Sequence, residues 1–147
     1  MPDKLDLSGD IASAIDGAAL RGKTAVLGYV GDDGYAAISF RGSLQVHGPT
    51  QLAFWARKTE GGVVAAISED PKVSVLYYGG PDGPGPVFLS FHGTAKVDPG
   101  ANDDVYGRMI EGERGQDPDR AGVAVVIDVQ TVQGFAADGG FEQAAEG

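Results

Sequence analysis

Apolar and polar residues alternate in short runs along this chain, and turn-forming residues separate the runs. The runs occupy residues 24–30, 35–40, 43–47, 51–56, 72–78, 87–97 and 121–129. Alternation with a period of two is typical of strands that bury one face. Gly31-Asp32-Asp33-Gly34 joins the first two runs and predicts a hairpin. The pattern therefore predicts a mainly β chain with about six short antiparallel strands.

Three other segments have the composition or spacing of helices. In residues 8–20 apolar side chains recur at i, i+3 and i+4, and Ser8 or Asp10 is placed to cap this helix. A short helical run follows two glycines over residues 61–69, and the polar residues 98–120 predict one or two further helices. Because strands and helices do not alternate regularly, we expect an α+β fold rather than parallel βαβ units.

Glycine and proline positions define the remaining segments. Residues 79–86 read GGPDGPGP and predict a long loop, and Gly93 interrupts the run 87–97 as a β-bulge would. The residues after 135 predict a loose, flexible C-terminal tail. We therefore expect one domain over residues 1–147, with a core at about 8–135 arranged as a closed or partly closed barrel.

Composition limits the function classes that fit. The chain has 147 residues, a formal net charge of -10 and no cysteine. The acidic balance disfavours nucleic-acid and anionic-membrane partners, and the lack of cysteine excludes disulfides and thiolate chemistry. No apolar run approaches the roughly 20 residues that span a bilayer, and the N-terminus lacks the order of a signal peptide. We expect a soluble, cytoplasmic protein.

One basic cluster stands out against this acidic background. Arg57-Lys58 follows the strand run 51–56 and precedes Gly61-Gly62 at the expected helix start. The N-terminus of a helix offers unpaired N–H groups and a positive partial charge to a phosphate. The arrangement favours a phosphorylated ligand, although Arg57 and Lys58 would also suit a solvated loop.

Other reactive side chains do not form a recognisable site. His47 and His92 are the only histidines, and no carboxylate cluster accompanies them, so we expect no metal site. We assign no catalytic acid, base or nucleophile. Asp32-Asp33, Asp103-Asp104 and Asp117 with Asp119 are expected to make local hydrogen bonds in turns and helix starts.

The serial order of these elements resembles the pyridoxamine 5'-phosphate oxidase-like split-barrel family of flavin and deazaflavin proteins. Residues 27–34 are similar to its first hairpin and residues 36–46 to its second strand. Residues 52–56, the helix 61–69 and the step DPKVSV at 70–75 are similar to its cofactor strand, helix and following strand. LSFHGTAKV at 89–97 is similar to its FxGxAxV strand, and residues 123–129 to its closing strand. The resemblance covers roughly residues 8–135.

The resemblance implies an FMN-binding type of split barrel that forms a homodimer, with a flavin or deazaflavin in each of two interface grooves. It implies hydride or electron transfer at the ring of the cofactor to a small substrate. The phosphate would lie at Arg57, Lys58, Gly61 and Gly62. The ring would be lined by Ser39, Arg41, Gly42 and Ser43. Trp55 would border the ring or the dimer interface, or fill the core.

The chain departs from the family at the helix start. Typical FMN-binding members carry a Ser-Arg-Lys run there, and Gly61-Gly62-Val63 replaces it in this chain. The loss of two cations favours the oligoglutamyl deazaflavin coenzyme over FMN. It also leaves open a non-catalytic protein that binds a flavin, haem or another small ligand, and a barrel without a cofactor.

Overall fold

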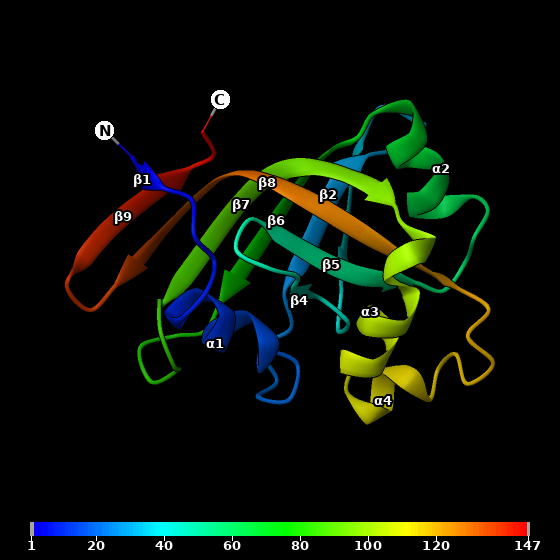
Figure 1. The fold of residues 1–147 in the computed structure, drawn as a ribbon. Helices are drawn as coiled ribbons and strands as arrows, with labels where there is room; N and C mark the ends of the chain where they lie inside the picture. The colour runs from blue at the N-terminus through cyan, green and yellow to red at the C-terminus, as the bar shows by residue number, and fades with distance from the viewer. Residues whose placement is uncertain (1, 147) are drawn as a thin grey trace.

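The computed structural model describes residues 2–146. It shows a strongly curved, mainly β structure with helices at its ends and on one side (Figure 1). The strands are β1 (Asp3–Lys4), β2 (Val26–Val30), β3 (Ala36–Phe40), β4 (Gln45–Val46), β5 (Gln51–Ala56), β6 (Lys72–Tyr78), β7 (Phe88–Val97), β8 (Val123–Ala136) and β9 (Gly139–Ala144). The helices are α1 (Asp10–Asp16), α2 (Gly62–Glu69), the 3-10 turn η1 (Pro99–Ala101), α3 (Asn102–Arg108) and α4 (Glu111–Arg114).

The sheet curls into a barrel that is open along one seam. Its strand order is β1-β9-β8-β7-β6-β2-β3, and β8 also pairs with β5, which in turn pairs with β4. Among the strands described, β3 pairs only with β2, so no hydrogen-bonded ladder joins β3 to β4 or β5. The expected α+β split barrel is therefore confirmed in its architecture.

The strand number is larger than the expected value of about six. The sheet contains nine strands, and it is mixed because β1 and β9 run parallel. β1 and β9 are the two strands that lie outside the predicted runs. Between β3 and β4 the chain turns at Arg41, whose carbonyl oxygen accepts a hydrogen bond from the Leu44 amide at 3.2 Å. This turn separates β3 from β4 and shortens the expected strand 43–47 to two residues.

β8 holds the sheet together because it changes partners along its length. Its first half pairs with β5 on one side and β7 on the other, and its second half pairs with β7 and β9. His92 pairs with Thr131 whereas Gly93 pairs with Val129, so Gln130 is the extra residue of a β-bulge. The predicted bulge at Gly93 is therefore confirmed, with its extra residue on β8. A Cβ atom at Gly93 would lie 2.5 Å from the Asp128 carbonyl oxygen, which requires glycine there.

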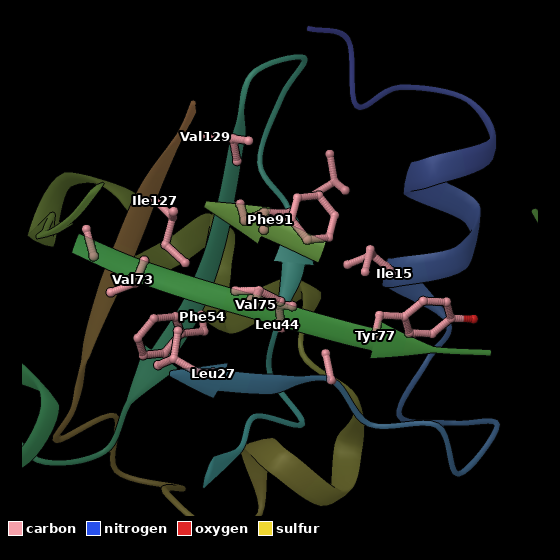
Figure 2. Packing of buried hydrophobic residues seen from close by; sticks show 14 of the residues in the cluster. Ile15, Leu27, Leu44, Phe54, Val73, Val75, Tyr77, Phe91, Ile127 and Val129 are labelled. Atoms are coloured by element: carbon pink, nitrogen blue, oxygen red, sulfur yellow. The ribbon is translucent and has the colours of Figure 1, made fainter. Parts of the chain in front are cut away.

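Two buried clusters fill the two sides of β5 and β8. The larger cluster lies inside the barrel, where Leu27, Phe54 and Phe91 pack with residues of β6 and β8 (Figure 2). Ile15 of α1 packs into this cluster, and so does Ile67 of α2. The smaller cluster lies on the opposite side of β5 and β8, under η1 and α3, and comprises Ala53, Trp55, Ala101, Val105, Tyr106, Met109, Ala124 and Val126.

Two predictions about the chain ends are wrong. The C-terminal residues do not form a loose tail, because β9 pairs with β8 from Thr131 to Ala136 and β1 pairs with β9. Helix α1 is shorter than residues 8–20 and ends before Gly17. Neither Ser8 nor Asp10 caps it, since Gly9 is the N-cap residue and the Ser8 hydroxyl donates a hydrogen bond to the Asp6 carboxylate at 2.6 Å.

In residues 2–146 no helix has the length and apolar character needed to cross a bilayer.

Candidate functional site

A cationic pocket of about 400 Å³ lies where β3 and β5 end and α2 begins. Five of the nine predicted site residues line it, namely Arg41, Arg57, Lys58, Gly61 and Gly62. The remaining lining residues are Tyr29, Ala56, Val63, Gln116 and Asp117. The pocket therefore combines residues that are local in sequence with residues from β2 and from the loop after α4.

Arg41 is the half-buried cation of the pocket. Its guanidinium carbon lies 5.2 Å from the centroid of the Phe54 ring, and its Nε donates a hydrogen bond to the Ser39 hydroxyl at 3.1 Å. Burial is the largest influence and lowers the pKa of Arg41, while Tyr29 opposes this shift and Arg57 adds to it. A guanidinium nevertheless stays charged in a protein, so Arg41 presents a fixed positive charge.

The other two cations stand at the entrance of α2. Arg57 and Lys58 are exposed, and neither forms a salt bridge to any residue between 2 and 146. Gly61 and Gly62 have φ values of 69° and 51°, a backbone region that favours glycine. No heavy atom lies within 4 Å of a Cβ built on either glycine, and no side chain caps α2. The first-turn N–H groups of α2 are thus open to an anion.

Asp117 is the buried carboxylate in the pocket wall, with 7% of its surface exposed. Its Oδ2 accepts hydrogen bonds from Trp55 Nε1 and the Gly122 amide, both at 2.8 Å, and its Oδ1 accepts one from the Ala121 amide at 2.9 Å. Burial opposes ionisation, but these three donors outweigh it and hold the pKa of Asp117 below its ordinary value. The carboxylate is therefore ionised at neutral pH.

The remaining predicted site residues lie behind or beside the pocket. Trp55 and Ser43 are buried, and the Ser43 hydroxyl accepts a hydrogen bond from the Trp55 amide at 2.9 Å. Trp55 fills the smaller cluster, where its ring meets Tyr106 edge to face with centroids 5.2 Å apart. Gly42 lies against the Glu113 side chain, and Ser39 reaches the site only through Arg41.

Five lining residues were not predicted from the sequence, and three of them, Tyr29, Gln116 and Asp117, carry polar side-chain groups. Tyr29 and Gln116 carried no local signal for a binding site. Asp117 was expected only to make local hydrogen bonds, and those to Ala121 and Gly122 are present. Its bond to Trp55 crosses 62 positions of the chain. No spacing rule relates residues so far apart, so the place of Asp117 in the pocket could not be predicted.

The histidines lie apart from the pocket. Nδ1 of His47 is 3.4 Å from Asp104 Oδ2, and His92 lies on β7 with its side chain exposed. Across residues 2–146, no group of three or more His, Asp or Glu side chains is arranged to hold a metal ion.

A second cavity, of about 660 Å³, opens on the outer face of β2, β3, β6 and β7. Large apolar side chains are exposed over the same face: Ile38 is 73% exposed, Phe40 75%, Leu76 53% and Tyr78 60%. Soluble monomers rarely expose contiguous apolar surface of this kind, so this outer face has the character of an interaction surface.

The ionised state of Asp117 makes stability depend on pH. Because its folded-state pKa is depressed, its contribution is present above the unfolded value of 3.8 and is lost as the pH falls through the folded value. When the pH is lowered from about 7 to about 3, the free energy of unfolding of the Asp117→Asn variant should therefore fall by less than that of the wild type. Urea unfolding followed by fluorescence of Trp55, the only tryptophan, measures this loss. The exposed neighbour Asp119→Asn should follow the wild type, and equal losses in all three proteins would contradict the expectation.

The fold is similar to that of several solved structures. No protein-family model matches the sequence, and no curated protein matches it at a significant level. A pyridoxamine 5'-phosphate oxidase-like protein from Lactobacillus delbrueckii is 18% identical, with a TM-score of 0.55 over 80% of this chain and 88% of that chain. A protein related to general stress protein 26, of the pyridoxinephosphate oxidase family, from Clostridium acetobutylicum is 13% identical, with a TM-score of 0.61 over 87% and 90%.

An F420 reductase is 20% identical, with a TM-score of 0.57 over 75% of this chain and 88% of that chain. These similarities agree with the resemblance in the serial order of elements and with the open seam between β3 and β5. The chain has the split-barrel fold of the pyridoxamine 5'-phosphate oxidase-like proteins.

Proposed function

We propose that this chain is a homodimeric oxidoreductase that binds a flavin or deazaflavin cofactor and transfers a hydride or electrons to a small substrate. The observation that carries the proposal is the convergence of Arg41, Arg57, Lys58, Gly61 and Gly62 on one pocket at the seam of the barrel. The split-barrel fold, shared with an F420 reductase and with pyridoxamine 5'-phosphate oxidase-like proteins, supports it.

The pocket residues fit a phosphate ester. A guanidinium offers paired N–H donors that match phosphate oxygens, and a lysine adds a mobile point charge. Gly61 and Gly62 leave open space in front of the helix, so a phosphate can approach the backbone N–H groups closely. Arg41 would hold the inner side of the phosphate, and Arg57 with Lys58 the outer side.

The cofactor would supply the redox chemistry, and the protein would bind it, orient it and exclude water from it. Hydride transfer to a bound substrate needs no protein acid or base at the ring. This agrees with a pocket wall whose charged groups are cations and one fully hydrogen-bonded carboxylate. We therefore assign no catalytic side chain.

Two features favour the oligoglutamyl deazaflavin over FMN. Gly61-Gly62-Val63 leaves the helix start without the two cations of typical FMN-binding members. The same glycines let a bulky anionic group approach the backbone at the helix start closely. The missing cations also favour, as a second candidate, a non-catalytic protein that binds a flavin, haem or another small ligand in the same groove.

A visible spectrum of the purified protein separates these candidates. Bound flavin gives a yellow protein and haem gives a Soret band. A colourless protein that reduces its substrate only with added reduced deazaflavin would support the first proposal. A protein that binds a cofactor but transfers no electrons from it would support the second.

The apolar outer face supports the proposed homodimer. Ile38 and Phe40 are exposed on β3, and Leu76 and Tyr78 are exposed on β6, which lies on the other side of β2 in the same sheet. Burial of such side chains by a second copy would remove them from water, which stabilises a dimer by about 25 cal/mol for each Å² of apolar surface buried. The face would also bring a second subunit close to the seam, next to the cofactor pocket.

The first prediction from the proposed function concerns the two exposed cations. Replacing Arg57 and Lys58 together by alanine should weaken cofactor binding by about 1.5–3 kcal/mol for each charged hydrogen bond that is lost. Isothermal titration with FMN and with the deazaflavin measures the change. The double variant Lys4→Ala, Lys96→Ala makes the same change in net charge away from the pocket and should bind like the wild type. Unchanged affinity for both cofactors in the Arg57, Lys58 variant would refute the assignment.

The second prediction concerns cofactor choice. The deazaflavin should bind more tightly than FMN, and its affinity should fall more steeply with salt because its oligoglutamyl tail adds negative charges. Competitive titration at about 50 and 500 mM salt tests both statements. Tighter binding of FMN at both salt concentrations, or binding of neither cofactor, would overturn the preference.

The third prediction concerns the dimer. Ile38→Glu and Phe40→Glu place charges on the apolar face of β3 and should convert a dimer into a monomer, because an unpaired buried charge is costly. Light scattering at micromolar concentration measures the mass. Leu20→Glu is a matched control, since Leu20 is 75% exposed but lies in the turn after α1, outside the sheet. A wild-type protein that is already monomeric would exclude the two-groove arrangement.

A further inference from the structure

A short segment after α4 connects the wall of the cationic pocket with the end of β5. Residues 117–122, which we call the strap, run from the pocket wall to the residue before β8. The ladder between β5 and β8 ends with the pair Ala56 and Val123, so the next step places Gly122 opposite Arg57. The strap therefore meets the chain where β5 ends and the exposed cations of the pocket begin.

The contact at Gly122 is too close for any side chain. Gly122 is buried, and a Cβ atom built on it would clash with the Ala56 carbonyl oxygen and lie 2.9 Å from the Arg57 Cα atom. It would also lie 2.7 Å from Nε1 of Trp55. Two of these three neighbours are backbone atoms, which cannot yield unless the chain itself moves. The backbone at the end of β5 thus rests directly on the backbone of the strap.

The strap is held in one conformation. The Asp117 carboxylate accepts hydrogen bonds from two amides of the strap, at 2.8 and 2.9 Å, and the Asp117 carbonyl oxygen accepts one from the Tyr106 hydroxyl at 2.9 Å. Among residues 2–146, Arg120 is the only residue other than glycine with a positive φ, which is 53°. Its guanidinium carbon lies 4.4 Å from the centroid of the Tyr106 ring. Such a backbone conformation persists only where the surroundings enforce it.

Arg57 depends on this support because its side chain has no charged partner within the protein. It is exposed and forms no salt bridge to any residue between 2 and 146. The reach of its guanidinium is therefore set by the place at which its backbone leaves β5. A hydrogen bond weakens steeply when its donor is displaced or misaligned, so this place decides how well Arg57 can bind an anion.

We propose that Gly122 is a positioning residue that acts through Arg57. The strap holds the end of β5 at the place from which the Arg57 guanidinium reaches a phosphate. The inference rests on the proposed function in one respect, that Arg57 binds a phosphate ester in this pocket. A side chain at position 122 would push the end of β5 away from the strap, and Arg57 would move with it.

A double-mutant cycle tests the link between the two residues. Gly122→Ala should lower the affinity for whichever of FMN and the deazaflavin binds the wild type more tightly by about tenfold, the loss expected for one charged hydrogen bond. In the Arg57→Ala background the same substitution should change the affinity by less than about twofold, because the contact that it would misplace is already gone. Equal losses in both backgrounds would mean that the strap supports the pocket as a whole, and they would overturn the inference.

Gly115→Ala is the matched control. Gly115 directly follows α4, and a Cβ atom there would have its nearest neighbour at 3.4 Å, an ordinary contact. This variant should bind the cofactor like the wild type. A Gly122→Ala variant that also binds like the wild type would overturn the inference and leave the proposed cofactor site standing.

A milder variant keeps the test decisive if Gly122→Ala does not fold. Tyr106→Phe removes the hydroxyl that donates to the Asp117 carbonyl oxygen and leaves the net charge unchanged. Its affinity for the cofactor should fall about threefold, and only while Arg57 is present. An unchanged affinity, or a loss that persists in the Arg57→Ala background, would overturn the inference.

Inorganic phosphate repeats the cycle without a cofactor ring. It is titrated into each variant while the backbone amide signal of Gly62 is followed by NMR. A loss of affinity in Gly122→Ala that disappears in the Arg57→Ala background supports the inference even when neither cofactor binds. If neither cofactor nor phosphate binds the wild type, the proposed function and the inference both fall.

Discussion

The seam between β3 and β5 is the constraint on which the rest of this structure depends. Without a ladder between these strands, the barrel interior would meet water beside Phe54. The guanidinium of Arg41 lies over the Phe54 ring and covers it, which a flat, weakly hydrated cation does well. Arg41 thus closes the core and, at the same point, provides the pocket with its innermost positive charge.

The location of the pocket follows from where chain segments end. Strands β3 and β5 end at the seam, and α2 begins there. The loop after α4 contributes Gln116 and Asp117 to the pocket at the same place. Segment ends carry unpaired backbone groups and turn residues, so they suit ligand recognition better than the middle of a sheet. On a chain of net charge -10, three cations at one seam create a local field opposite in sign to the rest of the surface.

Prediction from the sequence succeeded where the signal was local. The strands 51–56 and 72–78 have the expected bounds, because short apolar runs between clear turns leave little choice of register. Residues 57–62 include both exposed cations, Arg57 and Lys58, and the two glycines of the helix start. Because these residues are so close in sequence, a single turn brings them to the same pocket. Arg41 was predicted as a site residue from the family resemblance rather than from any local pattern. β9 was missed because its sequence is polar and glycine-rich, and pairing with β8 supplies what its own residues do not.

The placement of Ser43 and Trp55 shows why the residues expected to line a cofactor ring were harder to assign. Alternation along β5 correctly separates Trp55 from Phe54, yet both faces of this strand are buried. Because both faces of β5 pack against a buried cluster, the strand has no polar face that would indicate a ligand site. The orientation of the Trp55 side chain is set by its contacts with Tyr106 of α3 and with Asp117, which are distant in sequence. The same contact ties the loop after α4 to the smaller cluster and carries Asp117 into the wall of the pocket. Packing in the smaller cluster thereby fixes a negative charge in the wall of the cationic pocket.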